Sequence, residues 1–140
     1  MKVRLLLAHY AEVQAGQLFA LGLGWTEIGP DPSPFALAAL VEVTWEETNR
    51  RHQLQFVIVD ADGQPVQIPT PTGDQPFQVQ ADFDVGRPPG VAPGRSFIVP
   101  VAINIPPLPF PPSRDYVVRV LVDGNLQDET AFTVRARPPA

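Results

Sequence analysis

Proline is the residue that most constrains how this chain can fold. It occurs 18 times in 140 residues, well above the average of about 5%. Because proline has no backbone N–H and its ring clashes with the preceding turn of a helix, this density excludes long helices. Strands accept proline at sheet edges and at bulges. We therefore expect short strands joined by stiff loops.

An alternation of apolar and polar residues agrees with that expectation. Between residues 77 and 85, apolar side chains alternate with glutamine and aspartate, which is the period of a half-buried strand. Similar patterns predict strands over residues 3–7, 18–28, 35–45, 54–59, 97–105, 116–122 and 131–134. Together with the turn signals between them, they predict an all-β fold, an antiparallel immunoglobulin-like β-sandwich of eight or nine strands.

Two of these strands carry further information. Pro100 lies inside the strand over residues 97–105, so that strand is expected at a sheet edge or at a bulge. The strand over residues 35–45 has Ala36 and Ala38 on its second face, so its start is expected to be covered on both sides. The length predicts one domain, residues 1–136, and the last residues, 137–140, are expected to form a frayed tail.

Composition excludes several classes of function. The formal net charge is −5 with only 10 Lys and Arg, whereas a nucleic-acid partner needs a basic surface. There is no cysteine, which excludes disulfides, thiolate zinc sites and iron–sulfur clusters. The apolar runs are too short for a membrane span or a signal peptide. We expect a soluble, cytoplasmic protein that binds no membrane, metal or cofactor.

The densest polar segment is the candidate interaction patch, which consists of Trp45, Glu46, Asn49, Arg50 and His52. Loops on a rigid sandwich commonly carry recognition, so this segment could contact a partner. The alternative is a one-turn helix over residues 45–50 that connects two strands, with Asn49 capping backbone groups and the charges paired locally.

Aromatic residues near the loop ends suggest a second kind of site. Trp25 and Phe110 are candidate loop-end aromatics, which with Trp45 could line a small-ligand site for a sugar or a lipid. Gly22 and Gly24 precede Trp25, and they predict a bulge or a close approach beside its ring.

A hydrolase is the third hypothesis. The only histidines are His9 and His52, and a nucleophile would come from Ser33, Ser96 or Ser113. None of these serines lies in a nucleophile elbow. The hypothesis requires a histidine within hydrogen-bond reach of a serine or carboxylate in a pocket. His9 continues the apolar row of the first strand and is expected at the edge of the core.

Five segments together resemble a known family. They are LFALGLGW at 18–25, WEETNRRH at 45–52, VDADGQPV at 59–66, FDVGRPPG at 83–90 and YVVRVLVDG at 116–124. The chain is similar to small bacterial β-sandwich proteins that are known only as a domain of unknown function. The resemblance implies a fold and a bacterial setting, and it implies no activity, cofactor or catalytic residue.

Because no catalytic set converges, we expect a non-catalytic interaction or structural module rather than an enzyme. Its partner would be another protein or a second copy of itself, and it could be one subunit of a larger assembly. The small-ligand and hydrolase hypotheses remain as alternatives.

Overall fold

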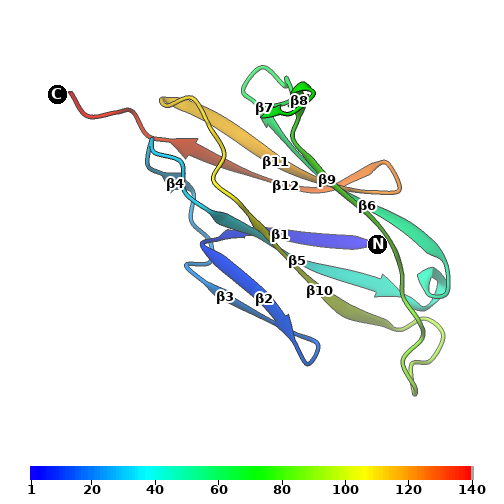
Figure 1. Cartoon of the computed structure of the whole chain (residues 1–140). Coiled ribbons are helices and arrows are strands. Elements are labelled where there is room, and N and C mark those ends of the chain that lie inside the picture. Colours follow the sequence, from blue (N-terminus) through cyan, green and yellow to red (C-terminus); the bar gives the residue numbers. More distant parts are fainter. Residues whose placement is uncertain (140) are drawn as a thin grey trace.

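A computed structural model describes residues 1–139 of the chain (Figure 1). Within these residues it is all-β, with twelve strands in four sheets and one short 3₁₀ helix, η1 (Trp45–Glu47). The prediction of an all-β fold is confirmed. The predicted number of eight or nine strands is wrong. Three short strands, at residues 10–14, 67–70 and 73–76, were not predicted, and the predicted strand over residues 18–28 divides into two.

Two sheets form the body of the molecule. The three-stranded sheet has the order β1-β5-β10 and consists of β1 (Lys2–Ala8), β5 (Phe35–Thr44) and β10 (Ser96–Ile105). The five-stranded sheet has the order β4-β12-β11-β6-β9 and consists of β4 (Glu27–Ile28), β6 (Arg51–Asp60), β9 (Gln78–Asp84), β11 (Arg114–Val122) and β12 (Asn125–Val134). Neighbouring strands are antiparallel, except that β4 runs parallel to β12. Pro100 lies on an edge strand, β10, as predicted.

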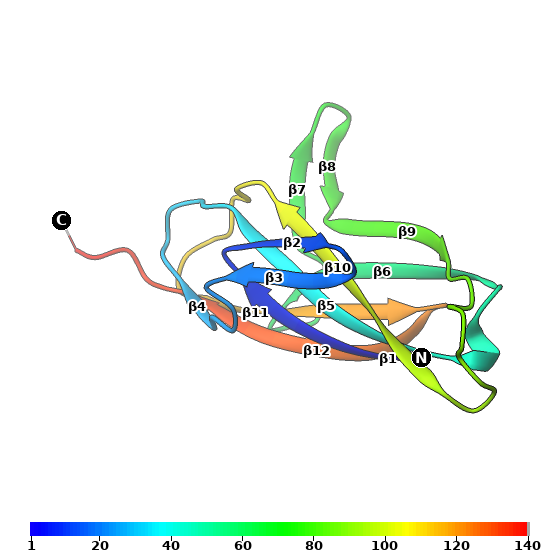
Figure 2. The same cartoon turned by 90° about the horizontal axis from the view of Figure 1, so that it is seen from below.

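Two hairpins complete the fold. One consists of β2 (Tyr10–Gln14) and β3 (Gln17–Leu21), and the other of β7 (Gln67–Thr70) and β8 (Gly73–Pro76). The β7–β8 hairpin stands away from the two main sheets (Figure 2). Local alternation predicted neither β2 nor this second hairpin, which lies in a proline-rich segment.

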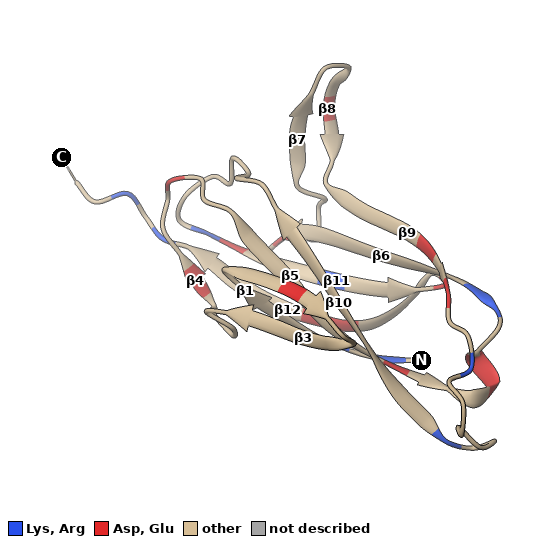
Figure 3. Ribbon diagram, turned by 60° about the horizontal axis from the view of Figure 1, so that its bottom comes forward, with Lys and Arg blue, Asp and Glu red and all other residues tan. Residues whose placement is uncertain are grey.

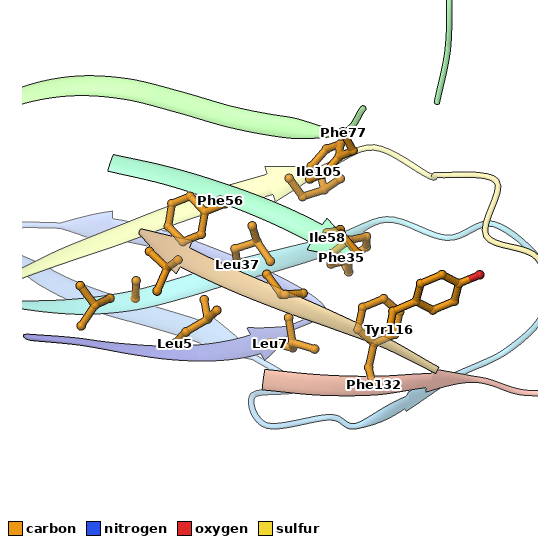
Figure 4. Close-up of a cluster of buried hydrophobic side chains, with 14 of the residues drawn as sticks. Leu5, Leu7, Phe35, Leu37, Phe56, Ile58, Phe77, Ile105, Tyr116 and Phe132 are labelled. Carbon is orange, nitrogen blue, oxygen red and sulfur yellow. The ribbon is translucent and has the colours of Figure 1, made fainter. Parts of the chain in front are cut away.

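The core lies between the two main sheets (Figure 4). Alternate residues of β1, β5 and β10 face alternate residues of β6, β11 and β12. At one end Phe132 packs within 6.4 Å, between ring centroids, of Trp25, Phe35, Phe110 and Tyr116. Full burial of one such aromatic side chain stabilises a fold by about 1.5–3 kcal/mol.

The outer face of the three-stranded sheet explains the run of alanines in β5. Register aligns its outward residues in four rows across the three strands, which are Lys2–Glu42–Ile98, Arg4–Leu40–Pro100, Leu6–Ala38–Ala102 and Ala8–Ala36–Asn104. The two alanine-rich rows lie under the β2–β3 hairpin, with which Ala8, Ala36 and Ala38 form a second, small core. Small side chains let the hairpin approach closely. The predicted coverage of this strand on both faces is confirmed.

Polar side chains hold the β2–β3 hairpin on the sheet and occupy a backbone donor at one sheet edge. The Asn104 side chain accepts a hydrogen bond from the Ala11 N–H at 3.2 Å and donates one to the Ala11 carbonyl at 2.8 Å. At the other edge, the Leu5 N–H donates to Asp128 Oδ2 at 2.8 Å. A side chain that occupies an edge N–H in this way blocks pairing with another strand.

The predicted strand over residues 18–28 is interrupted in the structure. It divides into β3 and β4 because Gly22 and Gly24 adopt φ of 65° and 88°, values outside strand geometry. The close approach predicted here exists, but its neighbour is the His9 ring rather than Trp25. His9 is exposed and stacks on Trp25 at 6.2 Å between ring centroids, and Trp25 itself packs against the core.

Gly22→Ala is expected to lower the free energy of unfolding by more than Gly24→Ala does. Both positions have positive φ, which costs an alanine about 1–2 kcal/mol. Only at Gly22 would the new Cβ also collide with the His9 ring. Chemical denaturation of both variants measures the difference, and His9→Ala in the Gly22→Ala background is expected to remove it. Equal losses for the two glycines would contradict the close contact.

The C-terminal segment follows β12 as exposed, irregular chain over residues 135–139. Arg137 Nη1 lies 2.8 Å from Asp31 Oδ1, and both side chains are exposed, so this ion pair contributes little. The tail predicted to fray, residues 137–140, ends at Ala140, which lies outside the described residues.

Candidate functional site

The segment that crosses from β5 to β6 carries the candidate interaction patch. It forms the short helix η1, which connects the two sheets as predicted but ends at Glu47 rather than at the expected residue 50. Thr44 precedes the helix, and Glu47 Oε1 accepts from its N–H at 3.0 Å and its hydroxyl at 2.9 Å. The carboxylate thus satisfies the Thr44 N–H at the helix start. The capping residue is therefore Thr44 and not Asn49.

Glu47 also binds the amino group of Met1, whose nitrogen lies 2.6 Å from Oε2. Burial alone would raise the pKa of Glu47. The hydrogen bonds from the amino group and from Thr44 outweigh burial, so the pKa of this carboxyl is lowered. Glu47 therefore stays ionised and forms an ion pair with the amino group that precedes β1, next to the end of β5.

His52 is the most enclosed polar residue of the patch, with 8% of its surface exposed. It continues the inward row of β6 and packs on Phe83. Its Nδ1 lies 2.8 Å from Asp123 Oδ2, and its Nε2 lies 2.8 Å from the Glu47 carbonyl oxygen. Both partners are acceptors, so only the imidazolium, which carries two N–H donors, satisfies both.

The pKa values of this pair follow from the geometry. Burial alone would lower the pKa of His52, but the hydrogen bonds to Asp123 and to the Glu47 carbonyl, with two nearby carboxylate charges, raise it on balance. The hydrogen bonds that Asp123 accepts from His52 and from the Gln53 N–H lower the pKa of Asp123. When His52 is protonated, the two side chains form an ion pair between β6 and the turn that joins β11 to β12.

Arg87 covers Trp45 from the β9–β10 loop. The guanidinium carbon lies 3.4 Å from the centre of the indole ring, which is a cation–π arrangement. Its Nε donates to Thr48 Oγ1 at 2.7 Å, and that hydroxyl donates to the Trp45 carbonyl at 2.6 Å. These contacts anchor the loop to the helix.

The structure therefore divides the candidate interaction patch. His52 is buried, and Trp45 is partly covered by Arg87. Glu46, Asn49 and Arg50 are exposed. Asn49 adopts a φ of 57° and its N–H donates to the Val85 carbonyl at 2.8 Å. The segment connects the two sheets and leaves three polar side chains available on the surface.

The same geometry bears on the hydrolase hypothesis. A carboxylate does lie within reach of His52, but both ring nitrogens are engaged. Ser96 is on β10, where its hydroxyl donates to Glu42 Oε1 at 3.0 Å. Neither ring nitrogen of His52 is therefore left to activate a nucleophile.

The two predicted loop-end aromatics point into the body. Phe110 is 8% exposed and belongs to the main core. Trp25 is partly buried and packs edge-on against Phe35 and Phe132. Its Nε1 is buried without a hydrogen-bond partner. These residues shape the core and do not form an exposed aromatic cluster.

A larger surface feature was not predicted from the sequence. Eight large hydrophobic side chains are exposed within residues 1–139. Seven of them lie on the outer face of the β1-β5-β10 sheet, on the β2–β3 hairpin or in the turn after it, namely Leu6, Tyr10, Val13, Phe19, Leu21, Leu23 and Ile98. We call this surface the hairpin face. A sequence signal for this surface does exist. Tyr10 and Glu12 before the Ala15-Gly16 turn, and Phe19 and Leu21 after it, stand at alternate positions and so share one side of a hairpin.

The outer face of the five-stranded sheet is different. Its outward positions hold mainly glutamine and charged residues, including Gln53, Gln55, Gln80, Asp82 and Arg119. In contrast, β3 and β10 contain no charged residue (Figure 3). The outer face of the three-stranded sheet is therefore the less polar of the two, although it carries Lys2, Arg4 and Glu42, and its hairpin carries Glu12.

Two shallow hollows lie on the hairpin face. One, of about 300 Å³, is lined by Tyr10, Glu12, Phe19, Ala20 and Leu21. The other, also of about 300 Å³, is lined by Lys2, Arg4, Leu40, Glu42 and Ile98. The first lies on the hairpin and the second on the part of the sheet beyond it.

Comparison with known proteins agrees with the sequence resemblance but adds no activity. In the described part of the chain, no helix is long and apolar enough to cross a membrane, and no group of three or more potential metal ligands is present. No curated protein and no solved structure matches the chain. The sequence profile of a family of unknown function matches residues 4–135, so the chain belongs to that family, DUF6941.

Proposed function

We propose that this protein is a non-catalytic interaction module and that it binds its protein partner through the hairpin face. The observation that carries the proposal is the concentration of exposed apolar side chains on this one face. Leu21 is 69% exposed and Phe19 is 50% exposed. Large apolar side chains that are left exposed in this number are typical of interaction sites.

The construction of the surface supports the proposal. Beneath the hairpin, the alanine-rich core and the Asn104 hydrogen bonds fix its position. A rigid platform presents its side chains with little loss of conformational entropy on binding. Tyr10 and Phe19 are aromatic, as interface hot spots commonly are.

Phe19→Ser is expected to weaken partner binding at least tenfold, or about 1.4 kcal/mol, because it removes a large, half-exposed apolar side chain from the face. Quantitative capture from the native lysate, with wild type and variant compared side by side, measures the loss. Gln80→Ser, on the polar opposite face, is the control and is expected to leave capture unchanged. Equal capture by wild type and Phe19→Ser would contradict the proposal.

The same proposal includes an immunoglobulin-like architecture. Two features support it: a three-stranded and a five-stranded sheet packed on one core, and the hydrogen bond from the Tyr116 hydroxyl to the Pro111 carbonyl at 3.2 Å. A tyrosine that bonds to backbone a few residues upstream is a recurring feature of such sandwiches. The bacterial setting, the cytoplasmic location and the absence of nucleic-acid partners stay predictions of the sequence.

A second candidate function is small-ligand binding at the hairpin hollow. Tyr10 and Phe19 provide aromatic surface, and Glu12 Oε2, which accepts from the Tyr10 hydroxyl at 3.3 Å, provides an acceptor. Such a combination suits a sugar better than a lipid, because a sugar needs both a stacking surface and hydrogen-bond partners. Calorimetric titration with simple sugars tests it, and Glu12→Gln is the variant to compare.

A further inference from the structure

We propose that the hairpin face binds a second copy of this chain in a two-fold symmetric dimer. This inference rests on the proposed function, because it names the occupant of the same surface. Shape, polarity and charge on that face each support it.

The hairpin face is stepped. The hairpin covers the alanine-rich rows of the sheet and adds one layer there, about 10 Å thick. No segment of residues 1–139 lies over the hollow beyond it, which Leu40 and Ile98 line. We call this hollow, which is lined by Lys2, Arg4, Leu40, Glu42 and Ile98, the recess. A two-fold axis along the step would place each hairpin in the recess of the other copy. Such an interface uses one patch twice, which is the commonest arrangement of soluble homodimers.

The apolar side chains of the two halves match in this arrangement. On the hairpin, Tyr10, Phe19 and Leu21 point away from the sheet, since their neighbours Ala11 and Ala20 face it. In the recess, Leu40 and Ile98 face outward, and Ile98 is 53% exposed. The dimer would cover both sets at once.

Charges on the two halves are complementary. The hairpin carries Glu12, whereas the recess carries Lys2 and Arg4. The one acidic residue of the recess, Glu42, accepts a hydrogen bond from Ser96. Each copy has a net charge of −5, so two copies repel at long range and need local opposite charges to set their register.

The projected area of the sheet alone is about half of what a stable dimer buries on each partner, and the side chains and the hairpin add to it. A ten-residue strand spans about 33 Å, and three strands are about 14 Å wide, which makes the projected area of the sheet about 450 Å². The relief of its side chains and the hairpin enlarge the accessible area beyond that. Stable interfaces bury about 800 Å² on each partner.

Charge exchange between Glu12 and Arg4 tests the dimer. Wild type is expected to be a dimer by light scattering at several protein concentrations. Glu12→Arg and Arg4→Glu are each expected to raise the dissociation constant at least tenfold, because like charges then face each other. An equimolar mixture of the two variants is expected to dimerise again, since the new arginine then faces the new glutamate. Asp82→Arg, on the opposite face, is the control and leaves the dimer intact.

Circular dichroism establishes that each variant is folded. Ile98→Asp replaces Arg4→Glu if the latter does not fold, and it too is expected to give monomers. A monomeric wild type, or a dimer that neither variant weakens, overturns the inference. If the wild type is monomeric but captures a different protein, and Phe19→Ser loses that capture, the proposed function stands without the dimer. If the wild type neither dimerises nor captures a protein through the hairpin face, both the dimer and the proposed function are contradicted.

Discussion

Phe132→Ala is expected to lower the free energy of unfolding by about 3–5 kcal/mol. Phe132 is 2% exposed, and its ring packs against four other aromatic rings contributed by β5, β11 and two loops. Truncation would leave a cavity that rigid strands on both sides cannot close. Urea denaturation followed by tryptophan fluorescence measures the loss, because Trp25 lies 5.5 Å from this ring between centroids.

The matched control is Phe19→Ala, which removes the same atoms from the surface. Phe19 is half exposed, so the expected cost is below about 1 kcal/mol. The pair separates the contribution of burial from that of the residue type. Similar losses for the two variants would contradict the placement of Phe132 in the core and of Phe19 on the hairpin face.

His52→Ala is expected to lower the free energy of unfolding by about 2–3 kcal/mol at slightly acidic pH. The substitution removes two hydrogen bonds of a charged donor, a class whose net contribution is about 1.5–3 kcal/mol each, and the exposure of the Asp123 side chain reduces the loss. It also leaves the Glu47 carbonyl oxygen without its partner. Chemical denaturation at a series of pH values measures the effect.

The pH dependence has a definite sign. Because the folded pKa of His52 is raised, its contribution is complete below the unfolded value of 6.5 and is lost as the pH rises through the folded pKa. Because the folded pKa of Asp123 is lowered, its contribution is complete above 3.8 and is lost as the pH falls through the folded pKa. The difference between wild type and variant is therefore expected to be largest between about pH 4 and pH 6.5.

A double-mutant cycle with Asp123→Asn isolates the pair. Since each residue stabilises the fold largely through the other, the double variant is expected to lose less than the two single losses combined. Strict additivity, or a difference from wild type that does not change with pH, would contradict an ion pair between Nδ1 of His52 and Asp123.

Local pattern predicted the long strands well because each buries one face. The inward rows of β6, β9, β10 and β11 alternate in sequence as they do in space. The short strands β7 and β8 were not predicted because they bury almost no surface. Their sequences therefore need no alternation of apolar and polar residues. The interruption between β3 and β4 depends on backbone angles of Gly22 and Gly24 that alternation does not encode.

The candidate site shows a similar division. The sequence indicated that a helix over residues 45–50 connects two strands, and a shorter helix, over residues 45–47, is there. It did not indicate that His52 would meet Asp123, which lies 71 positions further along the chain. Distant residues meet only through strand pairing, and the pairing of β6 with β11 brings these two together.

The sequence by itself determined that this protein is all-β, where its long strands lie and which face of each is apolar, because period-two alternation and proline act on neighbouring residues. Only the tertiary structure decided what those faces meet. The alanines of β5 are covered by a hairpin formed earlier in the chain, whereas Leu40 and Ile98 on the same sheet stay open. Burial is a property of the packed layers, so the exposed hairpin face became visible only when β2 and β3 were placed on the sheet.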